Sequence, residues 1–496
     1  MPTPVPLPQD PDLGQLRLRA RELSRAARAG DARALELVAR WAPDRAGGDV
    51  PLHLAQLVLA RMHGFDGWPP LVRHVETVLR LTWVPPTGDA PAGADPVDDF
   101  LSLACLRYDG DDPAHVRAAA ALLGAHPELG SASVHAAAAT ADVAALRRLA
   151  GPDTADREGG PNRWPPLMYL AYARHDPRID VASVVEAATI LLDHGADPDA
   201  GRLWHGLPSP FTVLTGVFGE GEGGPVAQPR HPAEQPLATL LLERGADPND
   251  AQTLYNRMFG ADDAHLELLF AHGLGRGDGG VWQARLGHTL PTPARMLADQ
   301  LDWAVLHGMT ARVELLARNG VGAEGGRRPA DTSVVGTAAR LGYPDIVDVL
   351  VAHGARRPEL TPVDALLAAA LSGDAAAVAA APAGVRAQVV AEHAGAVVVA
   401  AADGRPRAVE LLLELGVPVD TSGRGDAGGH ERWNTALHEA AFRGDEPLAA
   451  LLLDRGADPT LRDARFDATP AGWAEHAGHT RLAAVLSERE SGRRPR

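Results

Sequence analysis

The stretch TALHEAAFRGDEPLAALLLDRGADP, residues 435–459, decides the fold of this chain. Thr435 predicts a helix N-cap, and the apolar residues after it recur at the spacing of one helix face. Gly444 predicts the end of that helix, because a left-handed residue is favoured just after the last turn. A second helix is expected over 446–455 and ends at Gly456, so the stretch reads as two short antiparallel helices.

Related stretches recur along the chain. LLDHGADPD (191–199) and LLLERGADPND (240–250) repeat the ending, and further copies stand at 134–150, 301–321, 334–355, 400–420 and 468–486. Two short helices cannot cover their own apolar faces, whereas stacked copies can. The glycines expected to end the second helices are Gly195, Gly245, Gly273, Gly320, Gly354, Gly384, Gly416 and Gly456.

Residues 435–459 resemble an ankyrin repeat, whose pattern runs T-P-L-H-x-A-A-x-x-G and then L-L-x-x-G-A-x-P. The resemblance implies an all-α solenoid of about nine to eleven helix pairs that binds a partner protein through its concave face. Trp433 and Asp467 stand where the family has a turn glycine, so those two turns are expected to depart from the usual geometry. The segments ARMHGFDGWPPLVRHVE and FTVLTGVFGEGEGGPVAQPRHP also resemble parts of bacterial ankyrin proteins.

The predicted organisation has a helical N-terminal cap at 13–83 and a repeat array at 100–488. The Pro/Gly/Asp-rich residues 84–99 are interpreted as a linker, and 219–235 as a loop inserted into the array. Disordered ends are expected at 1–12 and 489–496.

Composition limits the function. The net charge is −17, which disfavours a general nucleic-acid binder and favours a basic partner through electrostatic steering. All 47 basic residues are arginine, so no phosphate-binding or Schiff-base lysine exists. Cys105 stands alone, which excludes an intrachain disulfide and a cysteine-rich zinc site. Without a signal-like N-terminus or a long uncharged apolar run, we expect a cytoplasmic protein with no membrane partner.

Three motifs suggest chemistry but lack the context that it needs. Residues 219–224 match G-x-G-x-x-G, yet prolines and two glutamates accompany them where a helix N-terminus should hold a pyrophosphate. The glycines at 275–280 follow a helix and not a strand. His476 and His479 lie one helical turn apart without a convincing third metal ligand. We therefore predict no catalytic residue, metal or cofactor; an enzyme with a site near 219–235, or a binder of small ligands or nucleic acid, is the alternative.

The predicted protein-binding residues occupy the two x positions before the glycine of A-A-x-x-G and the tips of the turns. Aromatic and arginine side chains on such a surface are typical of binding hot spots. Of the turn residues, Trp164 and Trp433 are equally compatible with packing across neighbouring turns. The predicted set is Trp164, Arg340, Leu341, Arg432, Trp433, Phe442, Arg443 and Phe466, and the x positions of two further repeats are Leu306 with His307 and Ala402 with Asp403.

Overall fold

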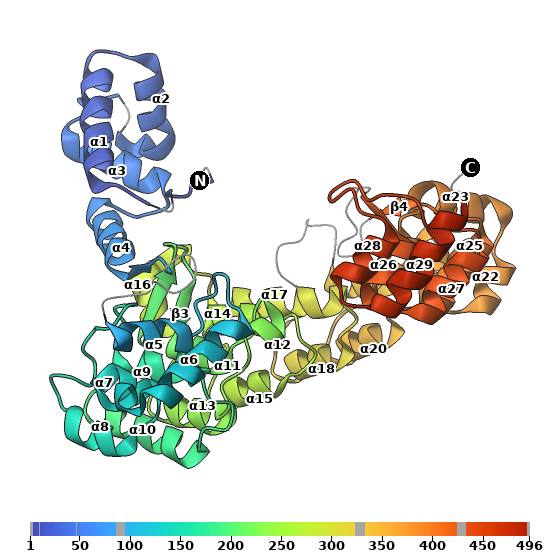
Figure 1. Ribbon diagram of the computed structural model, residues 1–496. Helices are drawn as coiled ribbons and strands as arrows, with labels where there is room; N and C mark the ends of the chain where they lie inside the picture. Colours follow the sequence, from blue (N-terminus) through green and yellow to red (C-terminus); the bar gives the residue numbers. More distant parts are fainter. Residues whose placement is uncertain are drawn as a thin grey trace. The chain divides into compact units, whose positions relative to one another are not determined.

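The computed structural model describes residues 3–8, 10–45, 47–85, 95–322, 333–423 and 433–493. These ranges form 29 α-helices and five short strands, which confirms the all-α, helical solenoid class (Figure 1). The chain divides into two compact units, Met1–Met296 (unit 1) and Leu297–Arg496 (unit 2), and the boundary lies within one helix of the predicted array.

The helices and strands of unit 1 are α1 (Leu13–Arg28), α2 (Ala32–Trp41), η1 (Pro43–Arg45), α3 (Leu52–Met62), α4 (Trp68–Leu81), β1 (Thr82–Trp83), α5 (Pro96–Ala104), α6 (Pro113–Ala125), η2 (Pro127–Ser131), α7 (Val134–Ala139), α8 (Val143–Leu149), α9 (Pro166–Tyr172), α10 (Val181–Asp193), β2 (Gly201–Trp204), β3 (Pro210–Thr212), α11 (Val213–Phe218), α12 (Gly224–Ala227), α13 (Glu234–Glu243), α14 (Ala251–Arg257), α15 (Ala264–Ala271), α16 (Gly280–Leu286) and η3 (Gly287–Thr289).

Those of unit 2, beginning with the helix that crosses the boundary, are α17 (Pro293–Leu306), α18 (Thr310–Arg318), α19 (Val334–Arg340), α20 (Pro344–Ala352), α21 (Pro362–Ser372), α22 (Ala375–Ala380), α23 (Ala383–His393), α24 (Ala396–Ala402), α25 (Pro406–Leu415), β4 (Ser422–Gly423), β5 (Asn434–Thr435), α26 (Ala436–Arg443), α27 (Glu446–Asp454), α28 (Pro470–His476) and α29 (Thr480–Arg493).

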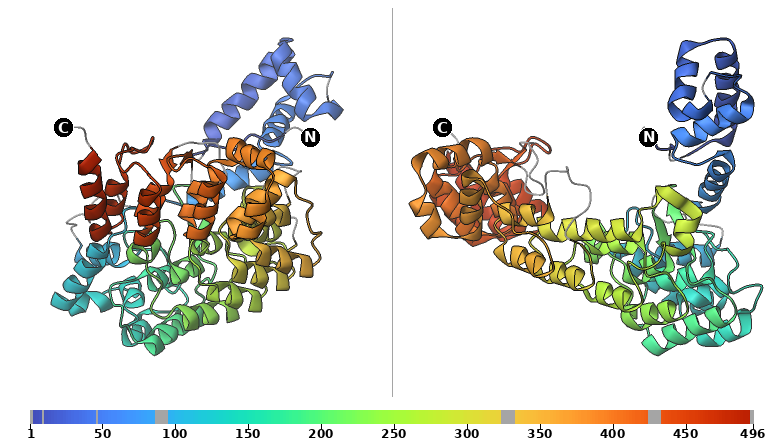
Figure 2. Two further views of the ribbon diagram at one scale, coloured as in Figure 1. Left: turned by 90° about the vertical axis from the view of Figure 1, so that its right-hand side faces the viewer. Right: turned by 180° about the vertical axis from the view of Figure 1, so that it is seen from behind.

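The pair α26–α27 forms where the sequence predicts it. Thr435 and His438 make a reciprocal capping box at the start of α26, and Gly444 ends the helix at a left-handed φ of 68°. The Asp445 side chain then caps α27 by accepting the Leu448 N–H. Because α26 packs between α24 and α28, the apolar face of each pair is covered by its neighbours (Figures 1 and 2).

Alanines make this close stacking possible in unit 2. Ala400 and Ala401 of α24 and Ala440 and Ala441 of α26 are fully buried. They belong to one apolar core that extends from Leu366 in α21 to Leu486 in α29. A methyl side chain lets neighbouring helices approach closely, so these positions specify the repeat.

Unit 1 has a similar stack, α7 on α9 and α9 on α11, but it adds other elements. Strand β2 pairs with β1 in parallel and with β3 antiparallel. The N-terminal helices α1 to α3 enclose their own cluster around Trp41 and Val58.

Several predicted boundaries differ from the structure. Val5 donates its N–H to the Met62 carbonyl at 2.8 Å, so part of the expected disordered segment 1–12 packs on α3. Helix α5 begins at Pro96, inside the expected linker 84–99, of which residues 86–94 lie outside the described chain. At the other end, α29 continues to Arg493 into the expected disordered tail 489–496.

One expectation about the helix ends is wrong. Gly384 does not end a helix but lies in the first turn of α23, because α22 already stops before Pro382. In the turn before α28, Asp467 takes a left-handed φ of 52°, a conformation that glycine adopts more readily than other residues. Aspartate tolerates this region because its short side chain can bond locally.

Candidate functional site: an aromatic cavity in unit 2

A cavity of about 680 Å³ lies on one face of unit 2. The ends of the helices α24, α26 and α28 and the turns that precede α26 and α28 contribute to its walls. This volume is within the range of ligand-binding clefts. Its lining residues are His307, Ala402, Asp403, Trp433, Glu439, Phe442, Phe466, Ala468, Gly472, Trp473 and His476. Three predicted binding residues, Trp433, Phe442 and Phe466, therefore meet at one place.

Four rings form what we call the aromatic cluster: Trp433, Phe442, Phe466 and Trp473. The Trp473 ring is at its centre, with centroid distances of 5.6 Å to Trp433, 5.9 Å to Phe442 and 6.4 Å to Phe466. These contacts are edge-to-face, the arrangement that aromatic quadrupoles favour. Phe442 and Phe466 remain 49% and 63% exposed, so the cluster presents apolar surface to solvent.

The turn before α28 fixes two of these rings. The buried Asp463 carboxylate accepts the backbone N–H groups of Phe466 (2.6 Å) and Ala468 (3.0 Å), together with the Trp473 indole N–H (3.0 Å). Burial opposes ionisation of Asp463, but these hydrogen bonds outweigh it and lower the pKa of the carboxyl. A charged Asp463 thus holds the turn and the central indole in one geometry.

Two carboxylates reach the cavity from neighbouring helices. Asp403 accepts from the Tyr343 hydroxyl at 2.9 Å and pairs with Arg405 at 2.5 Å. Glu439 accepts from the Asn434 side-chain amide. The cavity therefore combines an aromatic wall with acidic groups, and its described lining contains no arginine.

Trp473 and Glu439 were not predicted from the sequence, and His476 was considered only as a metal ligand. Trp473 is the fourth residue after its helix cap Thr469, which is the place that Glu439 holds after Thr435. The repeat alignment therefore contained a usable signal. Within the helices only the x positions before the glycine were predicted to be exposed, whereas the fourth position after the cap also faces the cavity.

The other predicted residues lie elsewhere. Arg443 is exposed, but its guanidinium donates to the Ala402 carbonyl at 2.9 Å. Arg340 and Leu341 are half-buried and do not line the cavity. Arg432 lies outside the described residues.

Trp164 is a packing residue. It is fully buried in unit 1, and its ring contacts Trp83 and Tyr172 at 4.8 Å each. Of the two interpretations that the sequence left open for this tryptophan, the structure supports packing, and Trp164 is withdrawn from the binding set.

The corresponding face of unit 1 is filled by the chain itself. Counting from the helix caps, Tyr169 and Tyr172 of α9 match Glu439 and Phe442 of α26, and both tyrosines are fully buried. The segment 105–111 covers them: the Leu106 N–H donates to the Tyr172 carbonyl (3.0 Å), and the Tyr108 ring lies 6.3 Å from the Tyr172 ring. Gln228 of the insertion then holds the segment by donating to Asp111 (3.1 Å).

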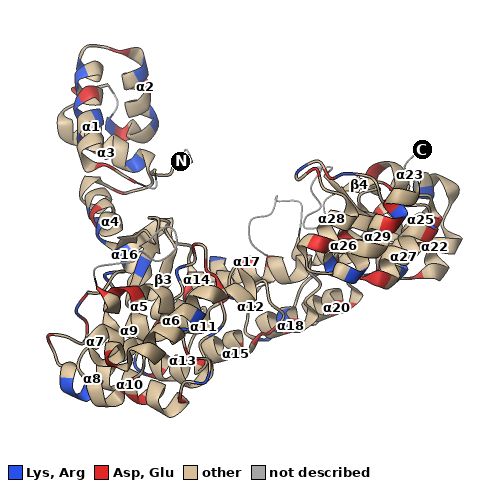
Figure 3. Ribbon diagram, in the orientation of Figure 1, with Lys and Arg blue, Asp and Glu red and all other residues tan. Residues whose placement is uncertain are grey.

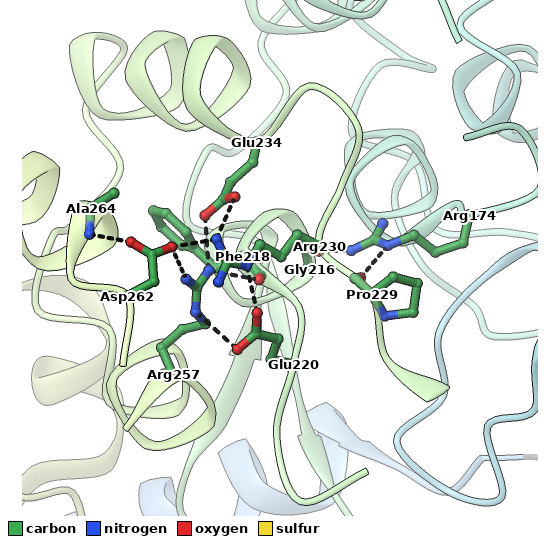
Figure 4. Close-up of polar contacts among 10 residues, drawn as sticks. All are labelled: Arg174, Gly216, Phe218, Glu220, Pro229, Arg230, Glu234, Arg257, Asp262 and Ala264. Carbon is green, nitrogen blue, oxygen red and sulfur yellow. Dashed lines mark hydrogen bonds and ion pairs between the residues drawn. The ribbon is translucent and has the colours of Figure 1, made fainter. Parts of the chain in front are cut away.

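The insertion 219–235 contains α12 and a charged cluster that packs it onto α14 (Figure 4). Arg257, only 1% exposed, pairs with Glu220 (3.4 Å), Glu234 (2.8 Å) and Asp262 (3.1 Å). Arg230 pairs with the same three carboxylates. Two guanidinium groups thus pair with three carboxylates in this cluster, which supports a folded insertion.

Residues from two of the other chemical motifs make structural contacts. In the 219–224 glycine motif, Gly219 lies against the Pro229 carbonyl and Glu220 is buried, which leaves no cradle for a phosphate. His479 bonds the Phe442 carbonyl (3.1 Å). Across the described ranges no group of three or more His, Cys, Asp or Glu side chains is arranged to hold a metal ion.

Basic and acidic residues are interspersed along the helices (Figure 3).

No single helix in the described part of the chain is long and apolar enough to cross a bilayer. The helices α23 and α24, bent by 70° relative to each other, pass that test only when taken together.

Part of the repeat array also matches a known family. Residues 397–453, which cover α24 to α27, match the family described as ankyrin repeats in many copies. The crystal structure of the human ASB11 ankyrin repeat domain is 23% identical over 48% of this chain and 97% of that chain, with a TM-score of 0.22. No match was found among curated proteins.

Proposed function

Since the chain carries ankyrin repeats, a module that suggests protein–protein interaction, we propose that it is a non-catalytic scaffold that binds a partner protein through the aromatic cavity of unit 2. The observation that carries this proposal is the gathering of Trp433, Phe442, Phe466 and Trp473 from two adjacent repeats around one cavity. Folding removes only part of Phe442 and Phe466 from water, since these residues remain 49% and 63% exposed. Removing apolar surface from water is favourable, so a partner that covers these rings gains the free energy that folding does not.

The difference between the two units supports the assignment to unit 2. In unit 1 the residues that match Glu439 and Phe442 are covered by the segment 105–111, whereas in unit 2 the face stays open over the described residues. A face already occupied by its own chain offers no surface to a partner.

The geometry of the cavity favours binding without rearrangement. Asp463 fixes the turn and the central indole before any partner arrives, and His438 bonds the Ala468 carbonyl across the two repeats at 3.2 Å. A preorganised surface loses little conformational entropy on binding, which leaves more of the contact energy as affinity.

The proposal is tested by site-specific photocrosslinking in cells of the source organism. The photoreactive residue p-benzoylphenylalanine replaces Phe442 or Phe466, and the matched control replaces Phe259, an exposed phenylalanine of unit 1. We expect the same covalently bound protein from positions 442 and 466 and not from 259.

That protein is then produced, and its affinity for the full chain is measured by calorimetry. The changes Phe442→Ala and Phe466→Ala should each weaken binding by about 1–2 kcal/mol, as truncation at a hot spot does, while Phe259→Ala leaves affinity unchanged. Equal crosslinking at all three positions, or full affinity in both cavity variants, would refute the cavity as the binding site.

A further inference from the structure

We propose that the cavity receives a cationic side chain of the partner, an arginine seated against the aromatic cluster next to Asp403 and Glu439. This inference rests on the proposed function and names the chemistry of the group that is bound. It is carried by the ring arrangement, by the charges of the lining and by two arginines of this chain that already use the same contact.

The ring arrangement suits a planar cation. The Trp473 ring has the other three rings 5.6 to 6.4 Å away, centroid to centroid, so a group in the cavity next to Trp473 can meet more than one ring. A guanidinium within roughly 6 Å of a ring centroid is attracted by the negative face of the ring, and tryptophan gives the strongest attraction. Arginine also stacks on rings through its own plane, which lysine cannot do.

The chain provides an internal example of this contact. The guanidinium carbon of Arg465 lies 5.5 Å from the centre of the Trp433 ring and 5.4 Å from that of Phe466. Arg465 is not among the residues that line the cavity. The rings of the cluster therefore already accept a guanidinium from outside the cavity.

A second example stands at the edge of the cavity. Arg405 lies 4.5 Å from the centre of the Tyr343 ring and pairs with Asp403. Here an aromatic ring and a carboxylate hold one guanidinium together. Trp473 with Glu439 offers the same combination of groups within the lining.

The charges of the lining favour a cation over an anion. Glu439 contributes a carboxylate, as does Asp403, whose charge is shared with Arg405 at 2.5 Å, and the described lining itself contains no arginine. Like charges across an interface are strongly unfavourable, so an acidic partner side chain would be rejected. The whole-chain charge of −17 steers a basic segment in the same direction.

The test uses three synthetic peptides that differ at one position: acetyl-Gly-Leu-Arg-Leu-Gly-amide and its citrulline and lysine counterparts. Citrulline has the shape of arginine without the charge. Each peptide is titrated to millimolar concentration into the full chain labelled with 5-fluorotryptophan, and fluorine NMR follows the tryptophans. Trp433→Phe and Trp473→Phe assign the two signals of the cluster.

We expect the arginine peptide to shift the Trp433 and Trp473 signals saturably, with the citrulline peptide at least about fivefold weaker and the lysine peptide in between. Phe466→Leu keeps an apolar side chain but removes one ring, and should weaken the arginine peptide about two- to fivefold. Phe259→Leu, the control in unit 1, should change nothing.

Equal binding of the arginine and citrulline peptides would overturn the inference, as would arginine-dependent shifts that spare both cluster tryptophans or the absence of any shift. The crosslinking experiment at Phe442 and Phe466 is independent of these peptides. If a partner is crosslinked but the arginine and citrulline peptides bind equally, the inference of a bound cationic side chain is refuted, while the proposed function still holds.

Discussion

The guanidinium of Arg443 donates a hydrogen bond to the backbone carbonyl of Ala402, 2.9 Å away in the preceding repeat. Arg443 also lies so close to Gly404 that a Cβ there would meet the guanidinium nitrogen at 2.6 Å. The adjacent residue, Phe442, instead lines the cavity and stays half exposed. The sequence predicted both residues to contact a partner protein. In the structure Arg443 links two repeats, whereas Phe442 faces the cavity.

Replacing Arg443 with Ala should destabilise the junction of α24 and α26 by about 1 kcal/mol, because one hydrogen bond from a charged donor is lost. Native-state hydrogen exchange on the full chain should show roughly fivefold faster exchange in these two helices. Arg455→Ala, at an exposed arginine after α27, is the control and should leave exchange unchanged. Unaltered protection in Arg443→Ala would mean that the bond to Ala402 contributes nothing.

Gly444→Ala should cost more than Gly456→Ala. Both glycines have left-handed backbones, with φ of 68° and 94°, so alanine is strained at either site by about 1–2 kcal/mol. A Cβ at 444 would also meet the His479 ring at 2.6 Å, whereas one at 456 meets nothing within 4 Å. Displacing His479 from the Phe442 carbonyl adds about 1 kcal/mol. Hydrogen exchange in α26 to α29 should be faster in Gly444→Ala than in Gly456→Ala. An equal loss of stability in the two variants would contradict the predicted contribution of the His479 contact.

Arg257→Met should destabilise the insertion of unit 1 by about 3–5 kcal/mol, because Glu220 and Glu234 would keep buried charges with one partner fewer. The control is Arg244→Met, which breaks the exposed pair with Asp193 (2.7 Å) and should cost about 0–1 kcal/mol. Exchange over residues 219–234 and α14 reports both variants. If Arg257→Met is as mild as Arg244→Met, the charged cluster does not hold the insertion.

The contribution of His175 to the stability of unit 1 should decline as the pH falls from about 7 to about 5, because this buried histidine resists protonation. Burial lowers the pKa of His175 from 6.5 to about 4, and Asp176 only partly opposes this shift. Between these values the unfolded chain binds the proton and the folded chain does not, so stability is complete above the unfolded pKa and declines below it. For His175 alone the loss at about pH 5 is roughly 2 kcal/mol.

His175→Gln removes that proton site and should flatten the pH dependence of the urea midpoint of unit 1. His194→Gln, at an exposed histidine of the same unit, serves as the control and should keep the wild-type slope. Identical slopes in all three proteins would show that His175 titrates normally.

The sequence by itself determined the repeating helix pairs, because the signals that start and stop them act within a few residues. A cap at Thr435, a left-handed glycine at Gly444 and alanines on the packed face need no knowledge of distant segments. The wrong expectation at Gly384 has the same local origin: α22 ends at Ala380 and is followed by Ala381 and Pro382 without a glycine, so the next glycine in the sequence was taken in its place.

Only the tertiary structure decided which aromatic residues face solvent. Trp164 and Trp433 were indistinguishable in the sequence, yet Trp164 is covered by Trp83 and Tyr172, while Trp433 borders the cavity. The segment 105–111 closes the face of unit 1 through a bond from Leu106 to Tyr172, which are far apart along the chain. The exposure of a side chain is set by whichever distant segment packs over it, and no local pattern records that segment.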